Sequence, residues 1–140
     1  MTVERFQAEH LKQLTLQPMQ AAAAPILEDP EYLAAIAQGV AMTIRNTQGD
    51  VMACAGSVDY EDGSLLWAFL DASAGRSMVA LIRAGRRLAE IARKPVYATA
   101  ACEFPAGCRL LQMLGFEQLP EPVAGVSADG RAHYVFVRYA

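Results

Sequence analysis

The most informative segment of the chain is Phe104-Pro-Ala-Gly-Cys-Arg-Leu-Leu-Gln-Met-Leu-Gly-Phe116. Proline suits the first turn of a helix, where its missing amide proton costs nothing, so Pro105 indicates a helix start. Glycine suits the position just after a helix, and Gly115 therefore indicates its end. The stretch predicts a helix over 105–114, followed by a strand over 116–119.

Two strands and a long helix lie upstream of this stretch. After Ser64, the run 64–70 is apolar without interruption, which is typical of a central strand buried on both faces. Residues 77–93 carry apolar side chains at three- and four-residue spacing, which predicts an amphipathic helix ended by Pro95. Residues 96–100 form the next strand. Two strands joined by a helix are expected to pair in parallel through a right-handed crossover.

The N-terminal half and the C-terminal end supply the other elements. Their predicted ranges are strand 2–6, a helix through Leu11 and Leu14 ended by Pro18, an alanine-rich segment 21–27 that could be helical, a helix from Pro30 to Gly39, strands 40–45 and 51–58, and strand 133–139. Asp29 precedes Pro30 as a helix cap, and residues 46–50 form a hairpin turn. The predicted order is β-α-α-β-β-β-α-β-α-β-β, an α/β single domain over 1–140 with a mixed sheet.

Composition excludes several classes of protein. The 140 residues are 54% hydrophobic and 19% charged, with a net charge of −3, which argues against disorder and against a general nucleic-acid binder. Charged residues or prolines interrupt every apolar run, so no membrane helix is predicted. The N-terminus lacks the pattern of a signal peptide, so we expect a cytoplasmic protein. Three cysteines without a CxxC pair, and only two histidines, indicate free thiols and no zinc site.

The element order and the Leu114-Gly115-Phe116 ending resemble the GNAT superfamily of N-acetyltransferases over nearly the whole chain. The resemblance implies a GNAT-like mixed sheet, acetyl-CoA as the acyl donor, and a small-molecule or protein amine as the acceptor. The chain departs from the family pattern at two positions. Phe104 stands where the family has Asn, and Leu111 stands where it has the Tyr that acts as general acid. We expect both side chains to pack in the core, and leucine cannot donate a proton.

The resemblance also assigns a cofactor-binding segment between the central strand and the long helix. The family's phosphate loop there reads Gln/Arg-x-x-Gly-x-Gly/Ala, whereas residues 71–78 contain one glycine. By resemblance, main-chain groups of Phe69, Leu70 and Asp71 would orient the pantetheine arm of acetyl-CoA. The pyrophosphate would be held by Ser73, Ala74, Gly75, Arg76 and Ser77. The alternative is an ordinary turn from strand to helix, with Ser73 or Ser77 as the cap.

Acetyl transfer to an amine needs a group that accepts the amine proton. The candidates near the expected cleft are Asp71, Glu103 and Tyr60. Their alternatives are a turn or cap role for Asp71, a helix-dipole role for Glu103, and a solvated turn for Tyr60. Cys102 could be a nucleophile, but its alanine neighbours favour a buried, inert thiol.

A stripe of arginines follows the predicted long helix: Arg83, Arg86, Arg87 and Arg93. These arginines would either bind the adenosine phosphate of coenzyme A or form a solvated face.

A second resemblance concerns small phage-encoded GNAT-like proteins. It is carried by the short phosphate loop, the aromatic central strand with Trp67 and the basic long helix. It implies an alternative function, a non-catalytic GNAT-fold phage or prophage protein with an assembly or binding role. Such a protein would be virion-associated, with a phage protein or a second copy of itself as partner. The departures at Phe104 and Leu111 favour this alternative.

Overall fold

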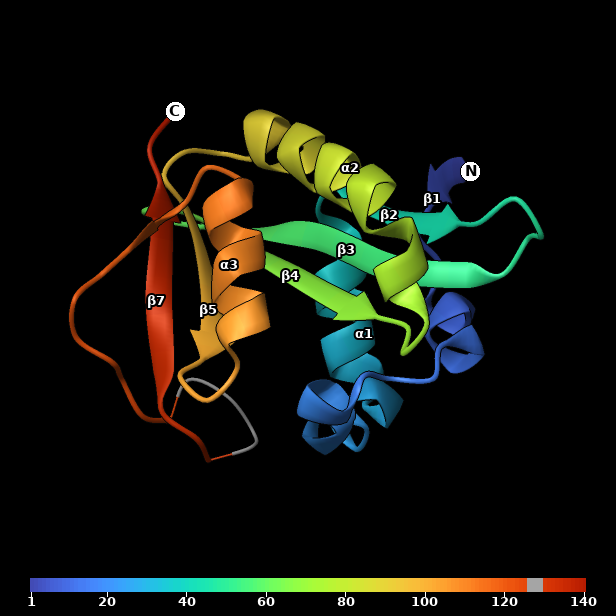
Figure 1. Cartoon of the computed structure of the whole chain (residues 1–140), viewed down its shortest axis with the longest axis horizontal. Coiled ribbons are helices and arrows are strands. Elements are labelled where there is room, and N and C mark those ends of the chain that lie inside the picture. The colour runs from blue at the N-terminus through green and yellow to red at the C-terminus, as the bar shows by residue number, and fades with distance from the viewer. Residues whose placement is uncertain (126–129) are drawn as a thin grey trace.

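The computed structural model describes residues 1–125 and 130–140 (Figure 1). Its strands form one seven-stranded sheet in the order β1-β2-β3-β4-β5-β7-β6. The strands are β1 (Thr2–Arg5), β2 (Ala41–Arg45), β3 (Val51–Tyr60), β4 (Gly63–Leu70), β5 (Val96–Ala101), β6 (Glu117–Gln118) and β7 (His133–Arg138). The α-helices are α1 (Pro30–Gln38), α2 (Met78–Ile91) and α3 (Pro105–Met113). The predicted α/β mixed sheet is confirmed.

The parallel pair in the centre of the sheet is short. β4 and β5 pair only at Ser64 with Val96 and at Leu65 with Tyr97 in the described part of the chain. All other neighbouring strands pair in antiparallel fashion. Beyond Leu65 the two parallel strands diverge, and the edge of β4 that faces β5 is left without a strand partner. This divergence explains why Ala68, in a strand predicted to be buried on both faces, is exposed.

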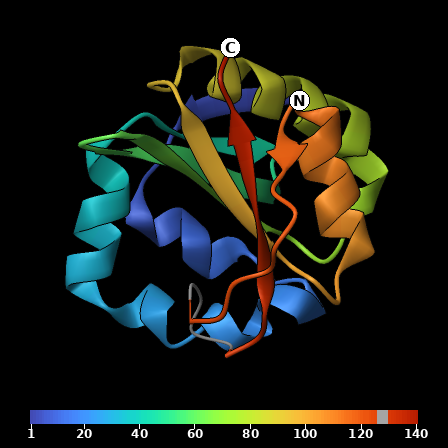
Figure 2. The same cartoon turned by 90° about the vertical axis from the view of Figure 1, so that its left-hand side faces the viewer.

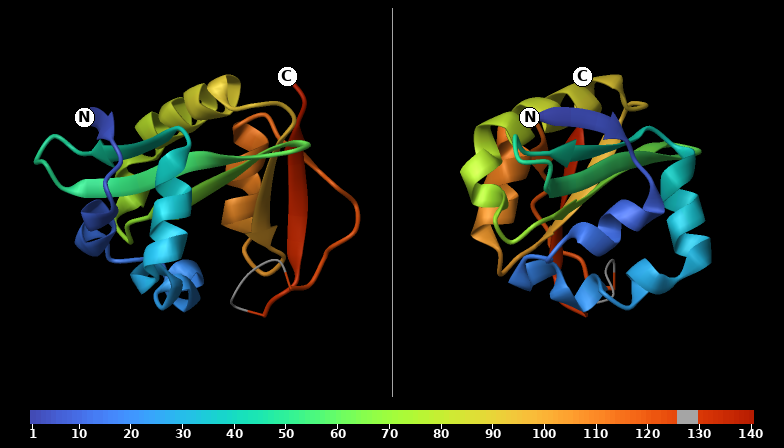
Figure 3. Two further views of the ribbon diagram at one scale, coloured as in Figure 1. Left: turned by 180° about the vertical axis from the view of Figure 1, so that it is seen from behind. Right: turned by 90° about the vertical axis from the view of Figure 1, so that its right-hand side faces the viewer.

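Helices cover both faces of the sheet. Figure 2 shows α2 and α3 on one side of the strands and α1 on the other, and the left panel of Figure 3, seen from behind, shows α1 crossing in front of the sheet. Ala89 of α2 and Leu111 of α3 pack with Phe136 of β7 in one buried cluster. On the opposite face, Ile36 of α1 packs with Trp67 of β4 in a second cluster. The core is therefore divided by the sheet into two layers.

The N-terminal helices differ from the prediction. Three 3₁₀ helices replace the expected α-helical segments: η1 (Ala8–Gln13), η2 (Pro18–Ala23) and η3 (Ile26–Glu28). Pro18 and Pro25 lack an amide proton and divide the segment into pieces too short for a stable α-helix. A fourth 3₁₀ turn, η4 (Ala74–Ser77), precedes α2.

The remaining boundaries agree with the sequence to within a few residues, and one capping prediction is wrong. The side chains of Ser73 and Ser77 make no capping hydrogen bond at η4 or α2 to any described residue. The Ser73 hydroxyl instead donates to Asp71, which is closer along the chain. Among the described residues, no helix is long and apolar enough to span a bilayer.

Candidate functional site

The divergence of β4 from β5 opens a cavity of about 510 Å³. Its walls come from the end of β4, from α2, from α3 with the residue before it, and from Gln17 and the start of η2. The lining residues are Gln17, Pro18, Met19, Leu70, Ala72, Met78, Ile82, Phe104, Ala106, Gly107, Arg109, Leu110 and Met113. Most of these side chains are apolar, and Arg109 is the charged one. The cavity therefore suits a ligand with a long, weakly polar arm and an anionic end.

The segment Thr15–Gln20, here called the strap, lies along the edge of β4 that β5 leaves open. The Gln17 amide donates to the Leu70 carbonyl at 3.2 Å, and the Ala72 amide donates to the Thr15 carbonyl at 2.7 Å. These two bonds flank an antiparallel bridge between Leu16 and Asp71. The strap thus extends the sheet by one short segment where a partner strand is missing.

The side-chain amide of Gln20 completes this pairing. Its Nε2 donates to the Ala68 carbonyl at 2.7 Å, and its Oε1 accepts from the Leu70 amide at 2.8 Å. A single side-chain amide thereby satisfies one carbonyl and one amide of β4. Main-chain groups of Leu70 that were expected to orient a pantetheine arm are bonded to the strap in this structure.

The predicted phosphate loop is also bonded largely to the chain itself. The amides of Ala74 and Arg76 donate to the carbonyls of Asp71 and Ser73 at 3.0 and 3.3 Å. Gly75 is open, because a Cβ built there meets no described atom within 4 Å beyond its chain neighbours. The Arg76 side chain is exposed beside it. The loop combines an ordinary turn with an accessible, positively charged tip.

Asp71 is held as an acceptor in this turn. Its carboxylate accepts hydrogen bonds from the Thr15 amide at 2.8 Å, from the Ser73 amide at 3.0 Å and from the Ser73 hydroxyl at 2.5 Å. Burial raises the pKa of Asp71, but the bonds from the Ser73 hydroxyl, the Thr15 amide and the Ser73 amide outweigh it and lower the pKa below its ordinary value. A carboxylate that accepts three hydrogen bonds is a weaker proton acceptor. Its role here is to hold the turn after β4.

We therefore expect Asp71→Ala to act on stability in a pH-dependent way. Because the folded pKa lies below the unfolded one, the ionised carboxylate stabilises the fold above about pH 4, and this contribution is lost as the pH falls through the folded pKa. Urea unfolding should show a loss of about 1 kcal/mol at neutral pH. The loss should shrink near about pH 3. Asp62→Ala, in the exposed β3–β4 turn, is the control and should be near neutral.

The three candidate catalytic residues do not gather at one place. Glu103 follows the end of β5 and is exposed, at the same edge of the sheet as Asp71, which follows β4. Tyr60 pairs with Gly63 in the β3–β4 hairpin, at the opposite end of β4. The topology therefore puts Asp71 and Glu103 at one edge of the sheet and Tyr60 at the other, and none of the three lines the cavity.

The two positions that depart from the family pattern have different environments. Leu111 is buried and packs with Ala98 and Phe136, as expected. Phe104 is half-buried and lines the cavity, so the expectation that it packs wholly in the core is wrong. Gly107 explains its position, because a Cβ there would lie 2.6 Å from the Phe104 ring. The absent side chain at Gly107 leaves room for that ring beside α3.

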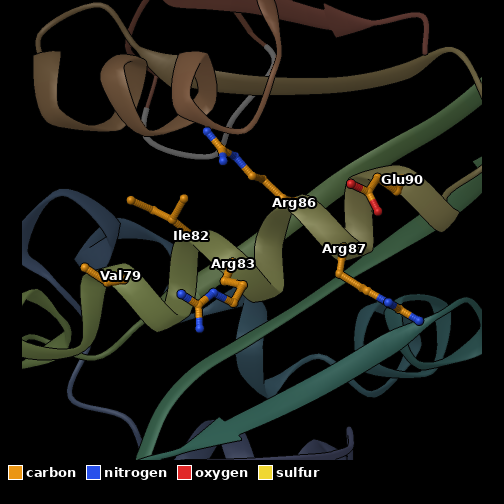
Figure 4. Close-up of a pocket in the computed structure, with 6 residues that line it drawn as sticks. All are labelled: Val79, Ile82, Arg83, Arg86, Arg87 and Glu90. Atoms are coloured by element: carbon orange, nitrogen blue, oxygen red, sulfur yellow. The ribbon is translucent and has the colours of Figure 1, made fainter.

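The arginines of α2 point in different directions. Figure 4 shows Arg86 extending toward α3 and Arg87 leaving the helix on another side. The Arg86 Nε donates to the Met113 carbonyl at 2.7 Å, and Arg93, which follows the end of α2, donates to the Tyr60 and Glu61 carbonyls. These two arginines connect elements of the fold.

A hollow of about 420 Å³ lies on the outer face of α2, beside the arginines. Its lining residues are Val79, Ile82, Arg83, Arg86, Arg87 and Glu90. Arg83 and Arg87 are exposed there. Three arginines of the predicted stripe thus line one hollow together with Glu90, and the fourth, Arg93, lies beyond the end of α2.

The cysteines are free thiols in the structure. Burial raises the pKa of Cys54 to about 11, although a contact of 3.7 Å with the Thr43 hydroxyl opposes this. Burial also raises the pKa of Cys108. Both thiols therefore stay protonated near neutral pH, and neither Cys54 nor Cys108 supplies a thiolate nucleophile. Within residues 1–125 and 130–140, no cluster of three or more His, Cys, Asp or Glu side chains could hold a metal ion.

Comparison with known proteins gives a fold and no close relative. No protein-family model and no curated protein matches the sequence. Among solved structures, a putative phosphinothricin N-acetyltransferase aligns with a TM-score of 0.71 at 15% identity, over 99% of this chain and 97% of that one. A GNAT superfamily phosphinothricin acetyltransferase from Sinorhizobium meliloti, in complex with AcCoA, aligns with a TM-score of 0.65 at 13% identity, over 99% and 87%.

A chimeric spermidine N-acetyltransferase SpeG from Vibrio cholerae and hSSAT also aligns over nearly its full length. The TM-score is 0.62 at 11% identity, over 99% of this chain and 96% of that one. The chain therefore has the GNAT acetyltransferase fold. At these identities the likeness shows the fold alone.

Proposed function

We propose that this protein binds an acyl-CoA, with acetyl-CoA as the simplest case, in the cleft between β4 and β5 and transfers its acyl group to an amine. The observation that carries the proposal is the cavity of about 510 Å³ at the divergence of the two parallel strands. A structural neighbour with the same fold was solved with AcCoA, which supports the same use of the fold here.

The binding geometry follows from the groups around this cavity. The pantetheine arm would lie along the edge of β4 that β5 leaves open, and its amide would take the place of the Gln20 side chain at the Ala68 carbonyl and the Leu70 amide. The pyrophosphate would lie at the turn around Gly75, where Arg76 and the N-terminus of α2 supply positive charge. Arg109 on α3 would face the anionic end of the ligand from the other wall.

In the transfer step, the amine nitrogen attacks the thioester carbon, a C–N bond forms and the C–S bond breaks. The proton of the amine goes to a carboxylate or to water, and coenzyme A leaves as a thiolate that solvent protonates. Glu103 is the more available proton acceptor of the two carboxylates at this edge, because it is exposed while the Asp71 carboxylate is engaged by three donors. Leu111 supplies no acid, and general acid–base assistance is worth about 10²–10⁴-fold, so we expect a slow enzyme.

The second candidate is a non-catalytic GNAT-fold protein with an assembly or binding role, as in a phage or prophage. It is favoured by the burial of Leu111 among apolar side chains, which leaves the usual acid position without a proton donor. The two candidates differ in turnover rather than in fold.

Isothermal titration with acetyl-CoA, followed by an assay for free coenzyme A thiol over a panel of amines, tests the proposal. We expect binding in the range of about 1 μM to 1 mM, where substrates of most enzymes bind, and slow release of thiol with at least one amine. Binding without turnover would favour the non-catalytic candidate. If neither the parent chain nor Gln20→Ala gives a heat of binding with acetyl-CoA at up to about 1 mM, the acyl-CoA assignment is wrong.

A further inference from the structure

We infer that the strap, residues Thr15–Gln20, is an intramolecular competitor of acyl-CoA that must leave β4 before the donor can bind. The inference rests on the proposed function and adds a regulatory element to it. Its starting observation is that the strap is hydrogen-bonded to β4 through the Gln17 amide and the Gln20 side chain, at the edge that faces the cavity.

Competition follows from the number of donors on this edge. The Leu70 amide carries one proton, and Gln20 Oε1 accepts it at 2.8 Å. An amide of the pantetheine arm that bonded the same group would have to displace Gln20, because one N–H makes one good hydrogen bond. The side-chain amide of Gln20 presents a carbonyl and an N–H to β4, which are the same two groups that a ligand amide would present. Strap and ligand therefore exclude each other at Ala68 and Leu70.

The strap also occupies space in the cleft. Gln17, Pro18 and Met19 form part of the cavity wall, opposite residues of α2 and α3. Release of the strap would remove this wall and widen the cavity along β4. The widened cavity would then accept the arm of the donor in the place that the strap leaves.

The strap and the 3₁₀ helices η2 and η3 lie at the surface, where Leu16, Ala23 and Leu27 are only partly buried against the cluster around Trp67 and Arg131 contacts Met19. No residue of η2 or η3 is buried, and both are 3₁₀ helices, whose hydrogen bonds are poorer than those of an α-helix. A groove of about 600 Å³, lined by apolar residues such as Leu14, Ala21 and Leu27, lies under these turns. Segments with few buried contacts open at low cost compared with the core.

The first test is the variant Gln20→Ala. It removes both side-chain hydrogen bonds to β4, and acetyl-CoA should bind about tenfold more tightly, because less binding energy is spent on displacing the strap. Hydrogen exchange at the amide of Leu70 should accelerate in the ligand-free variant. Gln38→Ala, at the exposed end of α1, is the matched control and should change neither quantity.

The second test locks the strap on β4. Leu16 and Asp71 face each other as a non-hydrogen-bonded antiparallel pair, for which Cα atoms lie about 4.5 Å apart, within the range that a disulfide spans. The double variant Leu16→Cys and Asp71→Cys, with Cys102 and Cys108 changed to alanine, should lose measurable acetyl-CoA binding when oxidised. A reducing agent should restore it in the same sample.

The outcomes separate this inference from the proposed function. Equal affinity of the parent and Gln20→Ala, or binding to the oxidised staple as tight as to the reduced one, would overturn the inference and leave acyl-CoA binding intact. If the parent, Gln20→Ala and the reduced staple all fail to bind acetyl-CoA, the proposed function is wrong, and the inference falls with it because there is no donor for the strap to exclude. Tighter binding by Gln20→Ala together with redox-dependent binding by the staple supports both.

Discussion

Replacing Phe136 by alanine should lower the free energy of unfolding by about 3–5 kcal/mol, the cost of a large cavity in a packed core. Phe136 has no exposed surface and lies among Ala98, Leu111 and Leu114, where β5, β7 and α3 meet. The small alanine at position 98 cannot move to fill the space. For a chain of this length the midpoint of thermal unfolding should fall by about 10 °C or more.

Circular dichroism during heating, together with urea unfolding, measures this effect. Tyr139→Ala is the matched control, because Tyr139 is an aromatic residue in the same C-terminal segment with 68% of its surface exposed. We expect it to change stability by less than about 0.5 kcal/mol. A loss below about 1 kcal/mol in Phe136→Ala would mean that the cluster around β7 is not the tightly packed core described above.

Replacing Gly75 by glutamate should weaken acetyl-CoA binding by about 30- to 100-fold, because it sets a negative charge within a few ångströms of the pyrophosphate, where screening by solvent is incomplete. The site accepts a side chain without strain, since a Cβ at Gly75 meets only open space. The change therefore tests the ligand position rather than the fold. Titration calorimetry on the parent and the variant measures it.

Gly75→Gln is the control for size, because glutamine has the shape of glutamate and no charge. It should reduce affinity by no more than about threefold, the scale of one weakened surface interaction. If the glutamate and glutamine variants bind acetyl-CoA as tightly as the parent, the pyrophosphate lies elsewhere and the turn after β4 is only a connection. Similar losses in both variants would point to steric blockage in place of charge.

Much of the fold could be predicted because it depends on local patterns. The apolar stripe of α2, the glycine after α3 and the proline at the start of α3 each indicate a helix or its end. These signals depend only on residues that lie close together in the sequence. The same holds for Asp29, whose side chain accepts from the Glu31 amide and caps α1 as expected. The short, diverging β4–β5 pair follows from no local pattern, because strand divergence is set by packing over the whole sheet.

The candidate site was harder to predict than the fold. The loop from Asp71 to Ser77 could be located by its place between a strand and a helix, and that placement agrees with the structure. The strap could not be found in this way, since Gln20 meets Ala68 and Leu70 across about 50 residues of chain, and a glutamine in an alanine-rich segment carries no distinctive signal. Phe104 was misjudged because the role of Gly107 beside it becomes visible only in three dimensions.

Among the residues that the structure describes, only two pairs join β4 to β5, far fewer than join β3 to β4 or β5 to β7 on either side of them. On one side, four antiparallel strands form a continuous ladder. On the other side, β5, β7 and β6 form a second one. Helix α2 spans the junction, because Leu81 shares a buried cluster with Met52 of β3 while Ala89 shares another with Ala98 of β5. The protein is thus built as two half-sheets joined by a short ladder and one helix, so the width of the cleft depends on how α2 packs on both halves.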